Sequence, residues 1–343
     1  MQLYEHGGDI YGSQANLVDF SINVNPLGMP EAAKRAIRES MDSFSLYPDC
    51  ECRALRAALS EKHGLGAEHI LCGNGASDLI FRVCALLGKC TALTLAPTFS
   101  EYERAVTLFG GRMLEHPLRV ENGFVLTADI LPRLMEKVDM LFLCNPNNPT
   151  GQLADPRLLA AILERCNQND ILMILDECFL DFTEGVSLLP ALSQYPNLLI
   201  LKAFTKFYGM AGLRLGYLLG DPALLARIRQ FGPEWSVSSV AQAAGLAALT
   251  EPDWAARTRA LVDAERGYLT EELQRFGLTV FPSDSNFLLV KSERPLHEAL
   301  RQKGILVRAC ENFSGLDAQY TRIGLKTHEK NAALVNAVRE VLA

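Results

Sequence analysis

The feature that most constrains the fold is a regular alternation of short apolar runs with amphipathic stretches over roughly residues 45–240. The runs are "HILCG" (69–73), "CTALTLA" (90–96), "DMLFLC" (139–144), "ILMILD" (171–176), "LLILKAF" (198–204) and "RLGYLLG" (214–220). They are continuously apolar, as strands covered on both faces of a parallel sheet are. Helical patterns such as "ASDLIFRVCALLG" and "DPRLLAAILERCNQN" separate them. The sequence therefore predicts an α/β fold with a mostly parallel sheet.

The pattern changes after this region. "EPDWAARTRALVDAERGYLTEELQRFG" predicts a long helix, and "LTVFPSDSNFLLVKS", "GILVRAC" and "YTRIGL" predict strands that are interleaved with further helices. This mixture is typical of a smaller α+β unit. We expect an N-terminal segment at 1–40 that packs with the small domain, a large domain at 41–245, and a small C-terminal domain at 246–343.

Composition narrows the classes of function. The net charge of −7 argues against nucleic acid or an anionic membrane as the main partner. No apolar run approaches the ~18 residues that span a bilayer, and the first residues lack the pattern of a signal peptide. The nine cysteines are scattered without a CxxC pair, which favours reduced thiols and a cytoplasmic protein. The six histidines show no ligand spacing, so no metal site is predicted.

Several polar signals follow the predicted strands, where ligands of such sheets bind. "GNGASD" (73–78) leads from a strand into a helix, and the backbone N–H groups of Gly75, Ala76 and Ser77 would bind an anion there. This stretch is neither a P-loop nor the GxGxxG fingerprint that a nucleotide-binding oxidoreductase would need.

Two later predicted strands, at 139–144 and 171–176, lead to an amide and a carboxylate. In "LCNPNNPTG" (143–151), Asn148 lies in a rigid turn at the strand end. In "ILDECFLDF" (174–182), Asp176 ends an apolar run and needs a cationic or N–H partner. The first stretch has an alternative interpretation as a plain turn. The alternative for Asp176 in the second stretch is a helix cap or a structural ion pair.

"FTKFYGMAGLRLG" adds a lysine and an arginine after a further strand. Lys206 is a candidate nucleophilic amine and Arg214 a fixed cation, although a lysine in a turn is more often a solvated charge. An anion site, an amide, a carboxylate, a lysine and an arginine are together what pyridoxal 5′-phosphate requires. The predicted cofactor is therefore pyridoxal phosphate, with Lys206 forming its Schiff base and Asp176 keeping its ring nitrogen protonated.

The order NPTG, DExF and TK(x)7R resembles the aspartate-aminotransferase fold type of pyridoxal-phosphate enzymes, the class I and II aminotransferase family. The resemblance runs over nearly the whole chain. It implies that Asn148 bonds the 3-hydroxyl of the cofactor and that Phe99, in "APTFSEY", stacks on its ring. It also implies the residues that bind the cofactor phosphate, which are Gly75, Ala76, Ser77, Thr205 and Arg214.

The same resemblance implies a homodimer and a binding site for the substrate carboxylate. Tyr47, in "LYPD", is similar to the tyrosine that reaches the cofactor phosphate of the partner subunit, and Arg322, in "YTRIGLK", to the arginine that binds the substrate carboxylate. Ala203 departs from the family pattern, because a hydroxyl residue for the phosphate often stands there.

Within the fold type, the chain resembles two enzyme families, histidinol-phosphate aminotransferases and L-threonine-O-3-phosphate decarboxylases. The stretches "HGGDIYG", "DFSINVNPLGMP" and "ILVRACENFSGL" favour the decarboxylases, which make aminopropanol phosphate for cobalamin synthesis. Phe179 also favours them, since the aminotransferases usually carry a tyrosine there. The expected reaction is thus the decarboxylation of threonine phosphate, and an aminotransferase that uses a keto acid is the alternative.

A small phosphorylated, amino-acid-like substrate needs cations or N–H groups. His6, Asn23 and Arg308 lie in segments that resemble the substrate-binding segments of the decarboxylase, and they complete the predicted site. A surface ion pair is the alternative for Arg308, and a flexible terminal residue is that for His6. A cofactor-sensing regulator built on this fold is a further alternative, which would need a DNA-binding domain.

Overall fold

The computed structural model describes residues 6–10, 17–135 and 137–343. Residues 11 and 12, the end of the "HGGDIYG" stretch, lie outside the described residues, as do parts of the predicted N-terminal segment 1–40.

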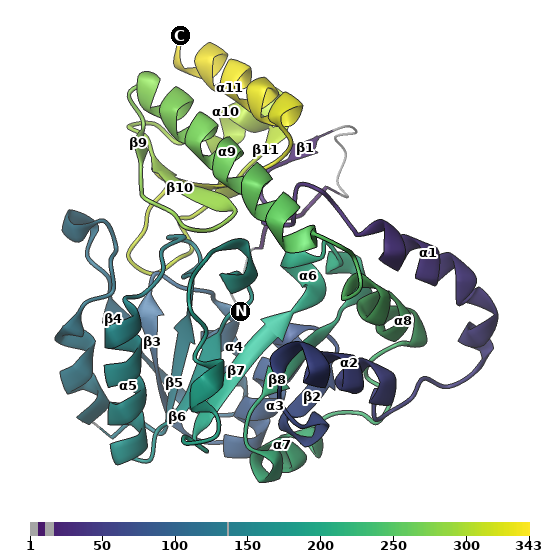
Figure 1. Cartoon of the computed structure of the whole chain (residues 1–343). Helices are drawn as coiled ribbons and strands as arrows, with labels where there is room; N and C mark the ends of the chain where they lie inside the picture. Colours follow the sequence, from purple (N-terminus) through teal and green to yellow (C-terminus); the bar gives the residue numbers. More distant parts are fainter. Residues whose placement is uncertain (1–5, 11–16, 136) are drawn as a thin grey trace.

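The central element of the described chain is a seven-stranded sheet, which forms the lower part of Figure 1. In spatial order its strands are β2 (Ile70–Gly73), β8 (Gly216–Leu219), β7 (Leu198–Ala203), β6 (Leu172–Asp176), β5 (Met140–Cys144), β3 (Thr91–Ala96) and β4 (Arg112–Pro117). Only β8 runs antiparallel to its neighbours in this sheet. The predicted α/β fold with a mostly parallel sheet is confirmed.

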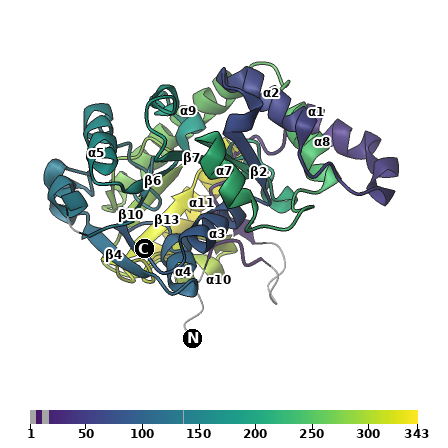
Figure 2. The ribbon, with the colours of Figure 1, turned by 90° about the horizontal axis from the view of Figure 1, so that it is seen from below.

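Helices cover both faces of this sheet, as the view from below shows (Figure 2). One face packs against α3 (Ala76–Leu87), α4 (Glu101–Leu108) and α7 (Pro222–Arg229). The other packs against α2 (Arg53–His63), α5 (Pro156–Gln168) and α8 (Ser239–Ala248). Side chains alternate between the two faces along a strand, so each buried strand contributes apolar side chains to the hydrophobic core on either face. This is why the apolar runs in the sequence are continuous.

The C-terminal residues form the smaller unit at the top of Figure 1. It contains a four-stranded antiparallel sheet with the order β12 (Arg308–Ala309), β13 (Tyr320–Gly324), β10 (Phe287–Lys291) and β9 (Thr279–Val280). Its helices are α9 (Trp254–Arg275), α10 (His297–Gln302) and α11 (His328–Leu342). The predicted long helix and strands are confirmed.

The N-terminal residues contact both units. Strand β1 (Val18–Asp19) pairs in parallel with β11 (Ile305–Leu306) of the smaller unit. Helix α1 (Glu31–Glu39) instead lies beside α8. The domain boundaries at residues 40 and 245 stay a prediction.

Two features of the main sheet were not predicted. Strand β4, with the sequence "RMLEHP", is an edge strand with several exposed residues, so it lacks the apolar run that marks the others. The reversed direction of β8 has no sequence signal either, because its burial on both faces gives it the same apolar pattern as a parallel strand.

Candidate active site

A cavity of about 420 Å³ lies where the carboxyl ends of β5, β6 and β7 meet the N-terminus of α3 and the smaller unit. Most of the predicted site residues line it: His6, Asn23, Ala76, Ser77, Phe99, Asn148, Asp176, Thr205, Lys206, Arg214, Arg308 and Arg322. Gly75 adjoins it as the residue before α3. Tyr47 does not line the cavity; it is 80% exposed and its ring lies 4.7 Å from that of Trp235.

Lys206 lies in the short helix α6 (Phe204–Phe207), directly after β7. Burial, together with the nearby charges of Arg322 and Arg214, lowers its pKa to about 8. Its Nζ lies 6.0 Å from the centre of the Phe179 ring. Lys206 is therefore not the solvated charge that a lysine in a turn usually is, and much more of it is neutral near pH 7 than an ordinary lysine would be.

Asp176 ends β6 and is buried. The phenol of Tyr102 donates a hydrogen bond of 2.6 Å to its Oδ2, and the backbone N–H of Cys178 donates one of 3.0 Å to its Oδ1. These donors hold the carboxylate in place. Tyr102 was not predicted, although it lies on α4 only three residues after Phe99, and the centres of the two rings are 5.5 Å apart.

The turn before α3 is shaped for close approach of a ligand. Gly75 has a φ of +86°, which favours glycine, and a Cβ there would lie 2.8 Å from Nη2 of Arg214. The first N–H groups of α3 lack helical partners, and together with Arg214 they are the kind of donors that bind an anion. Ala203 lines the cavity without a hydroxyl, which leaves Ser77 and Thr205 as the predicted hydroxyl residues there.

Arg322 and Asn148 meet inside the cavity. Nη1 of Arg322 donates a hydrogen bond of 2.5 Å to Oδ1 of Asn148, and Nη2 donates one of 2.7 Å to the carbonyl of Ser21. Burial lowers the pKa of Arg322 to about 10. Among the described residues, its Nε and the buried Oδ1 of Asn23 have no hydrogen-bond partner. Buried polar atoms of this kind require partners, and a bound ligand would supply them.

Arg308 and His6 lie at the outer part of the cavity. Arg308 is 6% exposed, so it is not a surface ion pair; it donates a hydrogen bond of 2.7 Å to Asn312 and lies 5.2 Å from the Phe313 ring centre. His6 is partly exposed, and its Nε2 lies 2.9 Å from Oε1 of Glu101. Glu101 is a cavity carboxylate that sequence reasoning missed.

These residues fit pyridoxal phosphate. The cavity combines an anion site at one end, an aromatic ring beside it, a carboxylate fixed at a strand end and a buried amine with a lowered pKa. No cluster of three or more histidine, cysteine, aspartate or glutamate residues among the described ones could hold a metal ion, and all nine cysteines are free thiols. None of the described helices is both long and apolar enough to cross a bilayer.

The chain belongs to the aminotransferase class I and II family, which it matches over residues 15–338. It is 40% identical to threonine-phosphate decarboxylase from Salmonella typhimurium, over 98% of this chain and 96% of that one. It is 33% identical to histidinol-phosphate aminotransferase from Bacillus velezensis, over 97% and 93% of the two chains. The fold matches the histidinol-phosphate aminotransferase from Clostridium acetobutylicum with a TM-score of 0.88 and 28% identity, over 95% and 99%. The predicted family and fold type are confirmed.

Proposed function

We propose that this protein is a pyridoxal-phosphate-dependent decarboxylase that converts L-threonine O-3-phosphate to aminopropanol phosphate and CO2, as a step of cobalamin synthesis. The observation that carries the proposal is the 40% identity to a threonine-phosphate decarboxylase over nearly the full length of both chains. The cavity agrees with this substrate, because threonine phosphate carries two anionic groups and the cavity holds two buried arginines, Arg308 and Arg322.

The cofactor of this protein is pyridoxal 5′-phosphate, and the residues in the cavity have matching roles. Lys206 binds its aldehyde, and Asp176 bonds its ring nitrogen. Asn148 bonds the 3-hydroxyl, and Phe99 stacks on the ring. The phosphate is bound by Gly75, Ala76, Ser77, Thr205 and Arg214. When bound, the cofactor supplies an electron-withdrawing ring that stabilises negative charge at the substrate Cα.

The protein supplies orientation and proton transfer. Arg322 holds the substrate carboxylate, and Arg308, Asn23 and His6 hold the substrate phosphate. Because both ends of the substrate are held, it is oriented so that the bond from Cα to the carboxylate is the one that breaks. After CO2 leaves, Cα requires a proton. Lys206 can deliver it, because a pKa of about 8 allows the amine both to hold and to release a proton near neutral pH.

A histidinol-phosphate-type aminotransferase that uses a keto acid acceptor is the second candidate. It is favoured by the 33% identity to such an enzyme and by the fold match to another. The same cavity residues would serve, and Lys206 would then move a proton from the substrate Cα to the cofactor.

The active form is a homodimer in the cytoplasm. Large apolar side chains are exposed near Tyr47: Met41, Phe44 and Leu46 precede it in the chain, and the ring of Trp235 lies 4.7 Å from its ring. A second copy would cover them, and Tyr47 would then reach the cofactor phosphate of the partner. The free cysteine thiols support a reducing compartment.

Two parallel assays test the reaction. The purified protein is incubated with L-threonine O-3-phosphate without a keto acid, and with histidinol phosphate plus 2-oxoglutarate, while CO2 and glutamate are followed separately. CO2 release from threonine phosphate alone is the expected result. Glutamate formation without CO2 would instead establish the aminotransferase.

A further inference from the structure

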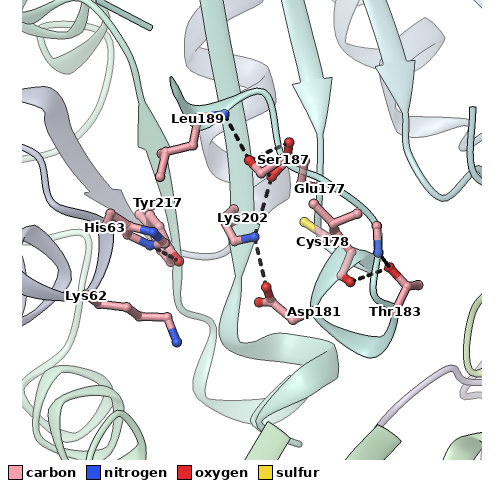
Figure 3. Close-up of polar contacts among 12 residues, drawn as sticks. Lys62, His63, Glu177, Cys178, Asp181, Thr183, Ser187, Leu189, Lys202 and Tyr217 are labelled. Atoms are coloured by element: carbon pink, nitrogen blue, oxygen red, sulfur yellow. Dashed lines mark hydrogen bonds and ion pairs between the residues drawn. The ribbon is translucent and has the colours of Figure 1, made fainter. Parts of the chain in front are cut away.

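An ion-pair cluster of Lys202, Glu177 and Asp181 lies at the ends of β6 and β7 (Figure 3). Nζ of Lys202 lies 3.0 Å from Oδ1 of Asp181 and 3.6 Å from Oε2 of Glu177. Lys202 is only 5% exposed and Glu177 only 1%. The proposed reaction does not use any of these three side chains, and burying Lys202 and Glu177 has a large desolvation cost.

The cluster joins the two strands that carry the proposed catalytic groups. Lys202 lies in β7, four residues before Lys206, and Glu177 directly follows Asp176 at the end of β6. The two strands are parallel neighbours, and the backbone N–H of Glu177 bonds the carbonyl of Leu201 at 2.9 Å. Side chains alternate between the faces of a sheet, so Lys202 and Glu177 meet on the face opposite the cavity.

The carboxylate of Glu177 and the backbone at Asp181 have further partners that fix them. Ser187 donates to Glu177, with its Oγ 2.9 and 2.7 Å from the two carboxylate oxygens, and the N–H of Leu188 donates at 3.2 Å. Arg259 of α9 donates to the backbone carbonyl of Asp181 at 3.2 Å. The loop that follows Asp176 is therefore held at several points, and Lys202 connects it to β7.

The two lysines of this segment have opposite environments. Burial works against the charge of Lys202, but Asp181 and Glu177 outweigh it and hold the pKa of Lys202 above its ordinary value. Burial, together with the nearby charges of Arg322 and Arg214, instead lowers the pKa of Lys206 to about 8. Lys202 therefore stays charged as a structural cation while Lys206 is available as an amine.

We propose that Lys202 and Glu177, with Asp181, are positioning residues that hold the ends of β6 and β7 together and so set the separation of Asp176 and Lys206. The inference rests on the proposed function of these two catalytic groups. A misplacement of about 1 Å can cost a reaction on the order of 100-fold in rate, so a fixed separation has a direct catalytic value. A buried ion pair adds little net stability, because the desolvation cost of its charges offsets their attraction. This favours a geometric role for the pair over a purely stabilising one.

The main test removes both fully buried charges of the cluster and leaves only the carboxylate of Asp181, whose side chain is 30% exposed. In the double variant Lys202→Met/Glu177→Gln, glutamine can still bond Ser187 and Leu188. We expect the variant to fold and to bind the cofactor, with kcat roughly 10- to 100-fold lower and KM changed by less than about threefold. The absorbance of the bound cofactor changes with pH, and we expect the midpoint of this change to move by about half a pH unit or more. The reason is that Lys206 would change its position relative to the charges around it.

Two further variants complete the design. Glu177→Gln alone keeps the Lys202–Asp181 contact, so it should fold readily and show the same changes to a smaller extent. Lys202→Arg keeps the charge and should retain most of kcat. The matched control is Glu265→Gln, which removes a buried carboxylate of α9 that contacts His328 and Asn331 of α11. It should lower the melting temperature but leave kcat and the pH midpoint unchanged.

The outcomes separate this inference from the proposed function. If the double variant and Glu177→Gln lose stability but keep kcat and the pH midpoint of the parent protein, the cluster is merely structural and the inference is wrong. If the parent protein itself binds no cofactor or converts neither phosphorylated substrate, the proposed function fails instead.

Discussion

At the scale of single residues, the cavity is dominated by cations. Lys206, Arg214, Arg308 and Arg322 all line it, and the buried carboxylate of Asp176 is already bonded by Tyr102 and a backbone N–H. Buried cations are costly unless anions or hydrogen bonds compensate them. This excess of positive charge predicts a ligand set with several anionic groups, as a cofactor phosphate and a substrate with a phosphate and a carboxylate would provide.

The lowered pKa of Lys206 predicts a pH-dependent penalty on the stability of the cofactor-free protein. Below about pH 8 the folded protein carries the full penalty of a charged, buried amine. Between about pH 8 and 10.5 the folded lysine loses its proton before the unfolded one, so the penalty disappears. Lys206→Met should therefore raise the free energy of unfolding by about 3 kcal/mol at neutral pH and by little near pH 10.

Urea unfolding of the cofactor-free parent and variant at both pH values checks this prediction. A stability difference that does not change with pH would contradict the buried, lowered-pKa state of Lys206. The same variant should bind the cofactor without a covalent link and lack turnover.

Asp176→Asn should remove the negative charge that we propose pairs with the ring nitrogen of the cofactor. We expect a loss in kcat on the order of 10²- to 10⁴-fold with the fold retained, measured with the substrate that the parent protein converts. Tyr102→Phe is the comparison variant, because it removes only the hydrogen bond of 2.6 Å to the same carboxylate. Its loss should be much smaller, and equal losses would show that the charge is not what matters.

At the scale of elements, the anion site depends on how α3 begins. Gly75→Ala should weaken cofactor binding, because the added Cβ would contact the Arg214 guanidinium and strain a backbone with positive φ. Gly88→Ala, at the other end of α3, is the matched control: it also has positive φ, but a Cβ there meets nothing within 4 Å. Titration of both variants with pyridoxal phosphate should show a weaker affinity only for Gly75→Ala. Equal affinities would remove the proposed phosphate site at this turn.

Much of this element-level arrangement follows from the sequence. Six strands of the main sheet coincide with the predicted apolar runs, because burial on both faces leaves an unmistakable pattern. Lys206, Asp176 and Asn148 were singled out because each lies at or shortly after the end of such a strand. Tyr102, Glu101 and the Lys202 cluster were not, since their roles depend on which helix and strand residues meet across the sheet, and no local pattern records such a contact.

At the scale of the whole molecule, the exposed apolar side chains around Tyr47 predict a dimer. Leu46→Asp should place a charge within this patch and shift the protein toward a monomer, which light scattering would detect. Because Tyr47 would then no longer reach a partner's cofactor, the affinity for pyridoxal phosphate should fall as well. A parent protein that is monomeric at micromolar concentration would rule out this role of Tyr47.

The central claim concerns the bond that breaks at the substrate Cα. The most direct measurement follows L-threonine O-3-phosphate, labelled with carbon-13 in its carboxylate, by nuclear magnetic resonance in deuterated water without a keto acid. We predict that the label appears as CO2 and bicarbonate, and that the aminopropanol phosphate formed carries one deuterium on the carbon beside its nitrogen. A label that stays in an organic acid, with consumption of substrate only when a keto acid is added, would contradict the decarboxylase.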